Sequence, residues 1–340
     1  MGKDTTVGWK FRIITRDDID AMTNRREGET KLGEMLQTIA AEDWEQALKD
    51  SPVKYVVIGI PEDIGVRANG GVGGAHTLWE PFLKAFCNIQ HTGTLNGEDI
   101  LVLGSFDFSE WMEQSMNMDL PALRVLVGQV DDAVFPVIEA VAAAGKMPIV
   151  IGGGHNNCYP ILKGVSNASG QSVNCINLDA HSDFRALEGR HSGNGFRYAK
   201  TEGYLSHYAI VGLHRNYNSQ LVLDTIRQEP DVHTSFFEDI FLEESLSFKA
   251  ALDQATNHTK DKPTGIELDL DCIERVLSSA ATPAGITSLQ ARQYLYHCCR
   301  HTHPAYLHLT EGAVVLRDGR ADNSTAKLVA YLVSDFIRAL

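Results

Sequence analysis

Three short polar motifs, each directly after an apolar run, carry the residues of this chain that are best suited to chemistry. The motifs are Gly152-Gly-Gly-His155, Asp179-Ala-His181-Ser-Asp183 and Asp269-Leu-Asp271. Side chains alternate in direction along an extended segment, so Asp179, His181 and Asp183 are expected to point the same way. Carboxylates and imidazoles that converge on one point are what a metal site requires. The motifs therefore predict a metal centre where strands end.

The composition of the ligand set indicates which metal it suits. The possible ligands are His155, Asp179, His181, Asp183, Asp269 and Asp271. A single zinc usually takes four ligands with a larger share of nitrogen or sulfur, whereas carboxylates suit manganese. We therefore expect two Mn²⁺ ions per chain. Two ions roughly 3.5–4 Å apart activate water and stabilise a tetrahedral intermediate, which indicates metal-assisted hydrolysis.

The elements that position these motifs alternate between strand and helix. Apolar runs at 53–60 and near residues 100, 149, 173, 209, 266 and 307 predict strands, and the ranges 123–144, 289–299 and 324–340 predict helices. This alternation is typical of a single α/β domain in which helices cover both faces of a mostly parallel central sheet. Ligands bind such sheets beyond the carboxyl ends of the strands, where all three motifs are expected to lie.

The first 50 residues have a different pattern from the rest of the chain. They are predicted to be mainly helical, so we expect residues 1–50 to form an extension that packs on a main domain of residues 51–340. The chain has no linker rich in proline or serine between these parts. One folded unit is therefore favoured over two.

Charge and cysteine usage limit the possible partners and compartments. The formal net charge of −14 argues against nucleic-acid binding, which needs a basic surface. No apolar run reaches the length of a membrane span. The six cysteines show no disulfide framework, which favours a reducing, cytoplasmic setting.

From about Val57 to its C-terminus, the chain resembles the arginase/agmatinase/formimidoylglutamase family, the ureohydrolases. The resemblance rests on the three motifs and on Glu311. It implies an arginase-like three-layer sandwich and hydrolysis of C–N bonds in linear amidines. It also implies ligand sets for the two ions: His155, Asp179, Asp183 and Asp269 for one, and His181, Asp179, Asp269 and Asp271 for the other. Asp183 is expected to help move a proton.

Three local segments, at 63–70, 192–196 and 278–287, look more like formimidoylglutamases than arginases. The resemblance implies conversion of N-formimidoyl-L-glutamate to L-glutamate and formamide, a step of histidine degradation. A carboxylate at Glu311 is suited to hold a cationic amidinium group. The two carboxylates of this substrate call for cationic or donor side chains. The candidates are Arg190, Asn194 and Arg197, with Arg67 and Arg185 as further possibilities.

Other functions are compatible with parts of this pattern. An arginase, agmatinase or other guanidino-compound hydrolase would use the same metal chemistry and release urea. A non-catalytic homologue would use the fold for ligand binding or assembly, although all six ligands are present. A metal-dependent deacetylase would hold one zinc with fewer carboxylates. Relatives form homo-oligomers, and we expect one here.

Overall fold

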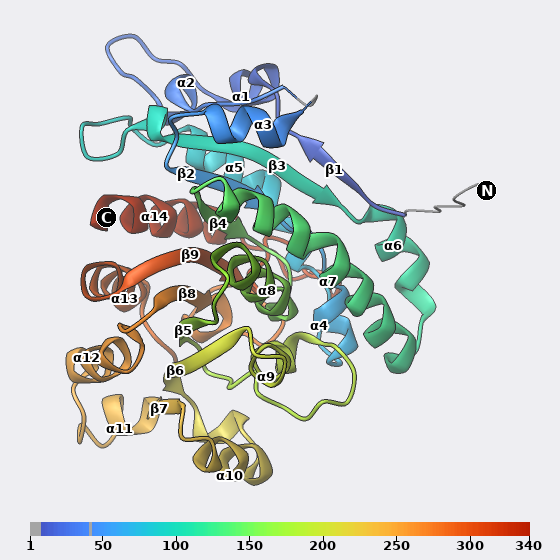
Figure 1. The fold of residues 1–340 in the computed structure, drawn as a ribbon, viewed down its shortest axis with the longest axis vertical. Helices are drawn as coiled ribbons and strands as arrows, with labels where there is room; N and C mark the ends of the chain where they lie inside the picture. Colours follow the sequence, from blue (N-terminus) through green and yellow to red (C-terminus); the bar gives the residue numbers. More distant parts are fainter. Residues whose placement is uncertain (1–7, 41–42) are drawn as a thin grey trace.

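The computed structural model describes residues 8–40 and 43–340, and this part of the chain is built on one sheet of nine strands (Figure 1). The strand order is β1-β3-β2-β4-β9-β8-β5-β6-β7. All neighbouring pairs are parallel except β1 and β3. The strands are β1 (Lys10–Ile13), β2 (Tyr55–Gly59), β3 (Ile100–Asp107), β4 (Met147–Ile151), β5 (Val173–Leu178), β6 (Leu205–Leu213), β7 (Val232–Phe236), β8 (Pro263–Asp269) and β9 (His303–Thr310).

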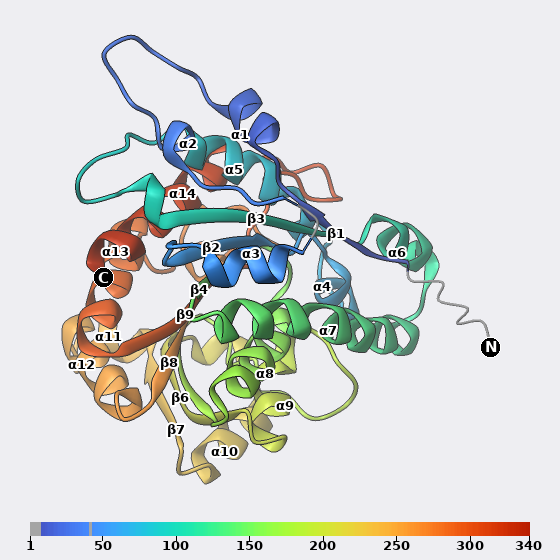
Figure 2. The same ribbon diagram turned by 45° about the horizontal axis from the view of Figure 1, so that its top comes forward.

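Helices cover both faces of this sheet. They are α1 (Arg16–Met22), α2 (Leu32–Met35), α3 (Trp44–Asp50), α4 (Ile64–Ala68), α5 (Trp79–Cys87), α6 (Ser109–Gln114), α7 (Leu120–Ala143), α8 (Cys158–Ser169), α9 (Gly195–Thr201), α10 (Gln220–Gln228), α11 (Phe237–Phe241), α12 (Phe248–Thr259), α13 (Ser288–His301) and α14 (Ser324–Ala339). The apolar residues of α5, α12, α13 and α14 share one core with one face of the sheet, and those of α7, α8 and α9 share a second core with the other face. Figure 2 shows these layers, so the predicted α/β class is confirmed.

The alternation of side chains in buried parallel strands explains the two cores. In β4, Ile149 and Ile151 belong to one core, and Val150 between them belongs to the other. Both faces of such a strand are covered, so an almost continuous apolar run is the expected sequence. The predicted strands and the long helices α7, α13 and α14 lie where the sequence indicates. Strands β1 and β7 were not predicted, because β1 is short and β7 carries only scattered apolar residues.

Local sequence signals explain where the long helices begin. The side chain of Asp119 accepts a hydrogen bond from the backbone of Ala122 at the start of α7. At the start of α13, Thr287 and Gln290 form a capping box. Both arrangements satisfy backbone N–H groups that the first turn of a helix leaves without partners.

The N-terminal segment contributes to the sheet itself. β1 pairs antiparallel with β3, with Phe11 opposite Phe106, and α1, α2 and α3 follow it in the chain. The first 50 residues are therefore not purely helical. Residues 1–7 and 41–42 of the predicted extension lie outside the described residues, and the division of the chain at residue 50 stays a prediction.

The register of the central strands places four strand ends side by side. β4, β9, β8 and β5 are consecutive neighbours in the sheet. Ile151 pairs with Leu309, Asp269 pairs with Thr310, and Leu178 pairs with Leu268. Loops that follow these strands must therefore meet at one edge of the sheet.

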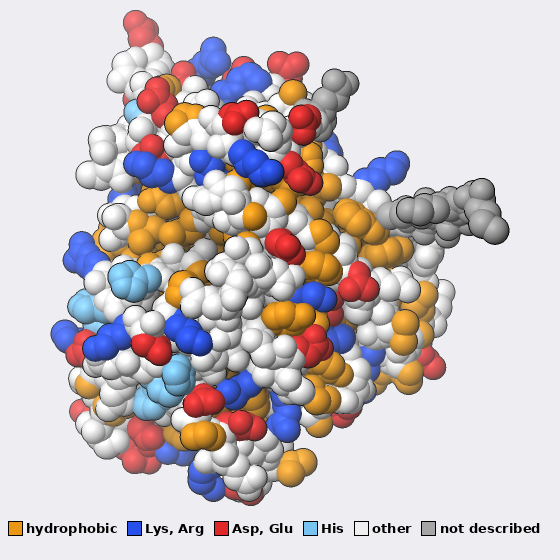
Figure 3. Space-filling view, viewed as in Figure 1, with side chains coloured by type: hydrophobic (Ala, Val, Ile, Leu, Met, Phe, Trp, Pro, Cys, Tyr) orange, Lys and Arg blue, Asp and Glu red, His pale blue; other side chains and the backbone are white. Residues whose placement is uncertain are grey.

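On the face shown in Figure 3, acidic and basic side chains are intermixed with apolar ones. Among the helices that the structure describes, none has both the length and the apolar character that crossing a membrane would require.

Candidate metal centre

The turn after β4 depends on glycine. Gly152 and Gly153 have φ angles of 87° and 77°, a region that residues with a Cβ atom rarely adopt. A Cβ on Gly153 would also lie 2.9 Å from the carbonyl oxygen of Ile60. This turn delivers His155, and the carbonyl of Gly153 accepts a hydrogen bond from the backbone N–H of Glu311 at 3.0 Å. The loops after β4 and β9 are thereby joined.

Asp183 and Glu311 have unusual backbone conformations. Their φ angles are 45° and 64°, and neither residue is a glycine. Such conformations cost about 1–3 kcal/mol each and concentrate at functional sites, where the surrounding structure enforces them. Here they direct two carboxyl groups toward the space between the strand ends.

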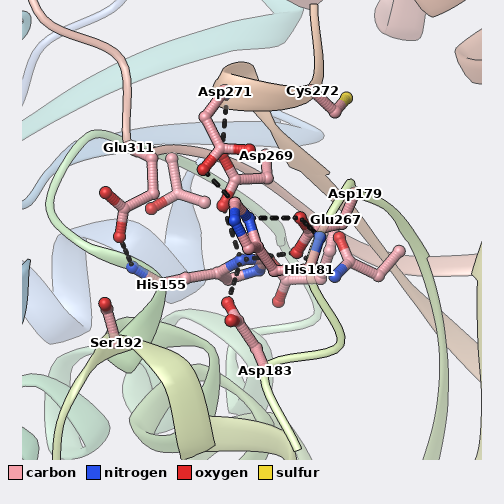
Figure 4. A network of polar contacts seen from close by, with 12 residues as sticks. His155, Asp179, His181, Asp183, Ser192, Glu267, Asp269, Asp271, Cys272 and Glu311 are labelled. Atoms are coloured by element: carbon pink, nitrogen blue, oxygen red, sulfur yellow. Dashed lines mark hydrogen bonds and ion pairs between the residues drawn. The ribbon is translucent and has the colours of Figure 1, made fainter. Parts of the chain in front are cut away.

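One group of possible ligands surrounds the imidazole of His155 (Figure 4). Its Nδ1 atom lies 2.8 Å from Asp183 Oδ2, 3.0 Å from Asp269 Oδ2 and 3.4 Å from Asp179 Oδ2. All four side chains are buried, and their ligand atoms lie within 4.8 Å of one another. These are the four residues predicted for the first ion.

A second group lies next to the first. His181 Nδ1 is 3.2 Å from Asp271 Oδ2 and 3.6 Å from Asp179 Oδ1. Asp179 belongs to both groups, as predicted for a bridging ligand, whereas Asp269 is grouped only with the first set. The structure therefore brings all six predicted residues together, and their ligation of metal remains a proposal.

The pKa values show the electrostatic cost of this arrangement. Burial, followed by the charge of Asp179, raises the pKa of Asp183 to about 6. Burial and the charge of Asp271 raise the pKa of Asp269 well above its usual range. Burial opposes a charge on His155, but the surrounding carboxylates raise its pKa well above normal. Crowded buried carboxylates therefore need positive charge, which divalent cations would supply.

One further observation fits bound cations. The Oδ1 atom of Asp271 is buried and has no hydrogen-bond partner among the described residues. A buried carboxylate oxygen without a partner is costly, and coordination of a metal would remove that cost. With four carboxylates and two imidazoles, the donor set suits Mn²⁺.

A cavity of 560 Å³ opens above this cluster. His181, Asp183, Asp269 and Asp271 line it, together with Glu311, while His155 and Asp179 are not among its lining residues. The other walls come from the loops around residues 66–72, 182–193, 217–222 and 279–280. The cavity is open to solvent and reaches the proposed ligands.

Glu311 is the one acidic residue of the cavity wall outside the six proposed ligands. Its Oε1 atom accepts a hydrogen bond from the backbone N–H of His155 at 2.9 Å. Burial and the charge of Asp271 raise the pKa of its carboxyl group to about 8. Cations bound to Asp271 and Asp183 would offset the repulsion that contributes to this shift, which would favour the carboxylate form.

The structure does not place Arg190 or Asn194 on the cavity wall. Arg190 is buried and donates to Asp131 Oδ2 at 2.8 Å, to Asn194 Oδ1 at 2.9 Å and to the carbonyl of Asn156 at 2.9 Å. The amide nitrogen of Asn194 donates to the carbonyls of Ala186 and Gly189. Both side chains help to hold the loop of residues 185–194, and their assignment to substrate binding stays a prediction.

Arg197 and Arg67 also lie away from the cavity wall. The guanidinium carbon of Arg197 is 5.4 Å from the ring centroid of Phe184. Arg67 donates to Asp63 and to Ser115. Among the described residues that line the cavity, Arg185 is the only lysine or arginine. It places one positive charge on a wall that also carries carboxylates and an imidazole.

Three buried polar residues beneath the cluster were missed by the sequence analysis. Glu267 lies on β8, and Tyr306 and His308 lie on β9. Burial alone would raise the pKa of Glu267, but the neighbouring His308 and His155 lower it to about 2. A sequence signal was present, since each of the three lies between two apolar residues in a strand that is covered on both faces.

A model of the arginase family matches residues 53–338 of the chain. The chain therefore belongs to the arginase family. This membership confirms the predicted enzyme class, a hydrolase that acts on C–N bonds of amidine groups.

Individual relatives are similar at modest identity. A formimidoylglutamase of Salmonella arizonae is 29% identical over 279 residues, which cover 78% of this chain and 80% of the relative. A formimidoylglutamase of Hahella chejuensis is 30% identical over 195 residues, or 53% of this chain, and the match spans 55% of that relative's length.

Solved structures show the same fold. A formimidoylglutamase of Bacillus subtilis superposes with a TM-score of 0.71 at 16% identity and covers 93% of this chain and 94% of its own. A formiminoglutamase of Trypanosoma cruzi, crystallised with Mn²⁺, has a TM-score of 0.69 at 20% identity, with 92% of this chain and 98% of its own covered.

Proposed function

We propose that this arginase-family enzyme hydrolyses N-formimidoyl-L-glutamate to L-glutamate and formamide with two Mn²⁺ ions per chain. The observation that carries the proposal is the composition of one cavity wall. The wall combines four of the six proposed metal ligands with Glu311, which suits a cationic amidine, and with Arg185, which suits an anionic group. The similarity to formimidoylglutamases supports the choice of substrate.

The proposed ligands for one ion are His155, Asp179, Asp183 and Asp269, and those for the other are His181, Asp179, Asp269 and Asp271. When bound, the two ions supply activated water for attack on the amidine carbon and stabilise the charge that develops there. The burial of these side chains and the shared position of Asp179 support this assignment.

The residues of the chain orient the substrate between the two ends of the cavity. A carboxylate at Glu311 accepts charge-assisted hydrogen bonds from the amidinium nitrogens. The guanidinium of Arg185 donates to Asn69 Oδ1 at 2.8 Å and to Glu188 Oε1 at 3.0 Å, and its remaining N–H groups can donate to the carboxylates of the substrate. A substrate held by Glu311 at its amidine end and by Arg185 at its carboxylate end would present the amidine carbon to the proposed metal ligands.

Asp183 is proposed to move the proton. Its carboxyl group lines the cavity next to the proposed ligands, so it can accept a proton from the attacking water. Cleavage of the C–N bond then requires a proton on the leaving nitrogen of glutamate, which the same carboxyl group can deliver. Formamide and glutamate are the balanced products.

We also propose that the reaction takes place in a reducing compartment. The six cysteines are all free and buried, which supports a reducing compartment such as the cytoplasm. Assembly into a homo-oligomer also stays a prediction.

A panel of four substrates tests the proposed reaction. The Mn²⁺-loaded protein is incubated with formimidoyl-glutamate, arginine, agmatine and guanidinobutyrate, and formamide and urea are measured. We expect formamide from the first compound and no urea from the others. Urea from any guanidino compound would replace the proposed substrate and keep the metal chemistry. No product from any compound, with two ions bound, would contradict the reaction.

A further inference from the structure

A second tier of polar side chains lies directly beneath the metal cluster. Glu267 precedes Asp269 by two residues on β8, so both point to the same face of the strand. Glu267 is paired in register with His308 of β9. Both side chains are fully buried, between strands whose neighbouring residues are apolar. A charged residue in such a place requires partners.

Each carboxylate oxygen of Glu267 has its own contacts. Oε1 accepts a hydrogen bond from the hydroxyl of Tyr306 at 2.7 Å. Oε2 lies 2.6 Å from Nδ1 of His308 and 3.5 Å from Nε2 of His155. Figure 4 shows Glu267 close to the ring of His155. The carboxylate therefore faces the nitrogen of His155 that points away from the other three proposed ligands of the first ion.

The two ring nitrogens of His155 have different surroundings. Nδ1 faces Asp183, Asp269 and Asp179. Nε2 is buried and makes no hydrogen bond within the described structure, with Glu267 at 3.5 Å. A neutral imidazole binds a metal through the nitrogen that carries no proton, so the proton must be on the other one. A carboxylate next to Nε2 favours that tautomer.

We propose that Glu267 is a positioning residue that keeps the proton of His155 on Nε2 and so leaves Nδ1 free to bind the metal. This inference rests on the proposed metal centre and extends it to a residue that does not contact the substrate cavity. A small movement of either side chain shortens the 3.5 Å separation to a hydrogen bond. The contact with His308 holds the carboxylate in place.

The substitution Glu267→Gln tests the proposal with little change in side-chain volume. An amide has one acceptor oxygen, whereas the carboxylate has two that face three possible donors. If the amide nitrogen faces His155, Nε2 must accept a hydrogen bond, and the proton moves to Nδ1. The metal-binding nitrogen is then blocked. We expect the affinity for the first Mn²⁺ ion to fall 10–100-fold, as for other outer partners of metal-binding histidines.

The matched control is Tyr306→Phe. It removes a buried hydrogen bond to the same carboxylate but on Oε1, so Oε2 still faces His155. Mn²⁺ binding is measured by calorimetric titration without substrate, and the thermal unfolding temperature is measured with a metal chelator present. We expect both variants to lower the unfolding temperature by similar amounts and only Glu267→Gln to weaken Mn²⁺ binding. A control that changes affinity more than threefold would indicate a merely structural role.

The variant Glu267→Asp provides an independent test if the glutamine variant does not fold. It keeps the charge but withdraws the carboxylate by one methylene group, and we expect weaker Mn²⁺ binding. Wild-type affinity in either variant would overturn the proposal. If the wild-type chain bound three ions and Glu267→Gln bound two, Glu267 would be a metal ligand. That result would also overturn the proposal.

These measurements separate the inference from the proposed reaction. Weaker Mn²⁺ binding in the variants supports the role of Glu267 even if the wild-type protein does not hydrolyse formimidoyl-glutamate. Unchanged binding overturns the role of Glu267 even if the wild-type protein is fully active. A wild-type protein that binds no divalent ion would overturn the inference together with the metal centre.

Discussion

Arg185 and Arg190 lie five residues apart in one loop, and they differ in exposure. The side chain of Arg190 is 9% exposed and donates to a carboxylate, an amide and a backbone carbonyl. The side chain of Arg185 is 48% exposed and lines the cavity, although it also donates to Asn69 at 2.8 Å and to Glu188 at 3.0 Å. Both arginines help to hold the loop, but only Arg185 lies on the cavity wall, where its remaining N–H groups can meet a ligand.

The pair Arg185→Met and Arg197→Met compares the arginine on the cavity wall with one that is not among the residues lining it. Loss of the Arg185 guanidinium removes the proposed partner of the substrate carboxylates. We therefore expect KM for formimidoyl-glutamate to rise about 10- to 100-fold, a range typical for the loss of a hydrogen-bonded charged group, with a small change in kcat. The Arg197 variant should keep KM within about threefold. Steady-state kinetics measure KM and kcat for both variants. A larger rise in KM for the Arg197 variant would favour Arg197, the residue predicted from the sequence, as the partner of the substrate carboxylates.

The six proposed ligands could be predicted from the sequence because their motifs directly follow strands. The surroundings of Arg190 could not be predicted, since its partner Asp131 lies 59 residues away on α7. Proximity along the chain to the metal motifs did not reveal which way its side chain points. Glu267 and His308 were missed because β8 and β9 were each interpreted as a whole strand, and the polar residues inside them were not considered separately.

At the scale of elements, short helices and loops build the cavity walls around a rigid sheet. Asp63 links α4, whose Val66 lines the cavity, to two other segments. Its carboxylate contacts Arg67 of α4 at 2.8 Å, His76 at 3.0 Å and Arg317 at 3.2 Å. Burial alone would raise the pKa of Asp63, but the hydrogen bond from His76 and the charges of the arginines lower it to about 2. The folded state therefore favours the ionised form.

The sign of the pH dependence follows from this shift. An unfolded aspartate has a pKa of about 3.9, so the contribution of Asp63 is complete above that pH and is lost as the pH falls toward about 2. At about 1.4 kcal/mol per pKa unit, the difference corresponds to about 2.6 kcal/mol of unfolding free energy. We expect Asp63→Asn to lose at least this amount at pH 7, measured by urea unfolding, because the arginines are left without their anion.

The control for this element is Asp253→Asn. Asp253 of α12 pairs with Lys249 at 2.7 Å and with His297 of α13 at 3.2 Å, and its side chain is 40% exposed, so solvent screens these interactions. Little change in unfolding free energy is expected. Equal effects of the two substitutions would mean that Asp63 does not hold the cavity wall together.

At the scale of the whole molecule, the order of strands in the sheet brings the residues of the candidate metal centre together. Four neighbouring strands, β4, β9, β8 and β5, end level with one another and contribute residues that are far apart in the chain. The alternation of strands and helices predicted this edge from the sequence. The exact neighbours could not be predicted, because periodicity does not give strand order, and the edge strands β1 and β7 were missed because they bury little apolar surface.

Metal binding should couple to the stability of the whole molecule. The buried carboxylates repel one another without cations, and the ions bind only the folded chain. We expect Mn²⁺ at 100 times its dissociation constant to add about 2.7 kcal/mol, which raises the unfolding temperature, and a chelator to reverse the effect. Asp271→Ala should reduce this gain, whereas Glu274→Ala, a carboxylate close by in the chain, should not. A gain that is the same in both variants would contradict the assignment of Asp271.

The central claim is that two Mn²⁺ ions held by the six strand-end ligands drive amidine hydrolysis. Formamide release from formimidoyl-glutamate, measured as Mn²⁺ is added stepwise to metal-free protein, tests it most directly. The account predicts no turnover without metal and a rise to a plateau at two bound ions per chain. Full activity in metal-free protein, or a plateau at one ion per chain, would contradict it.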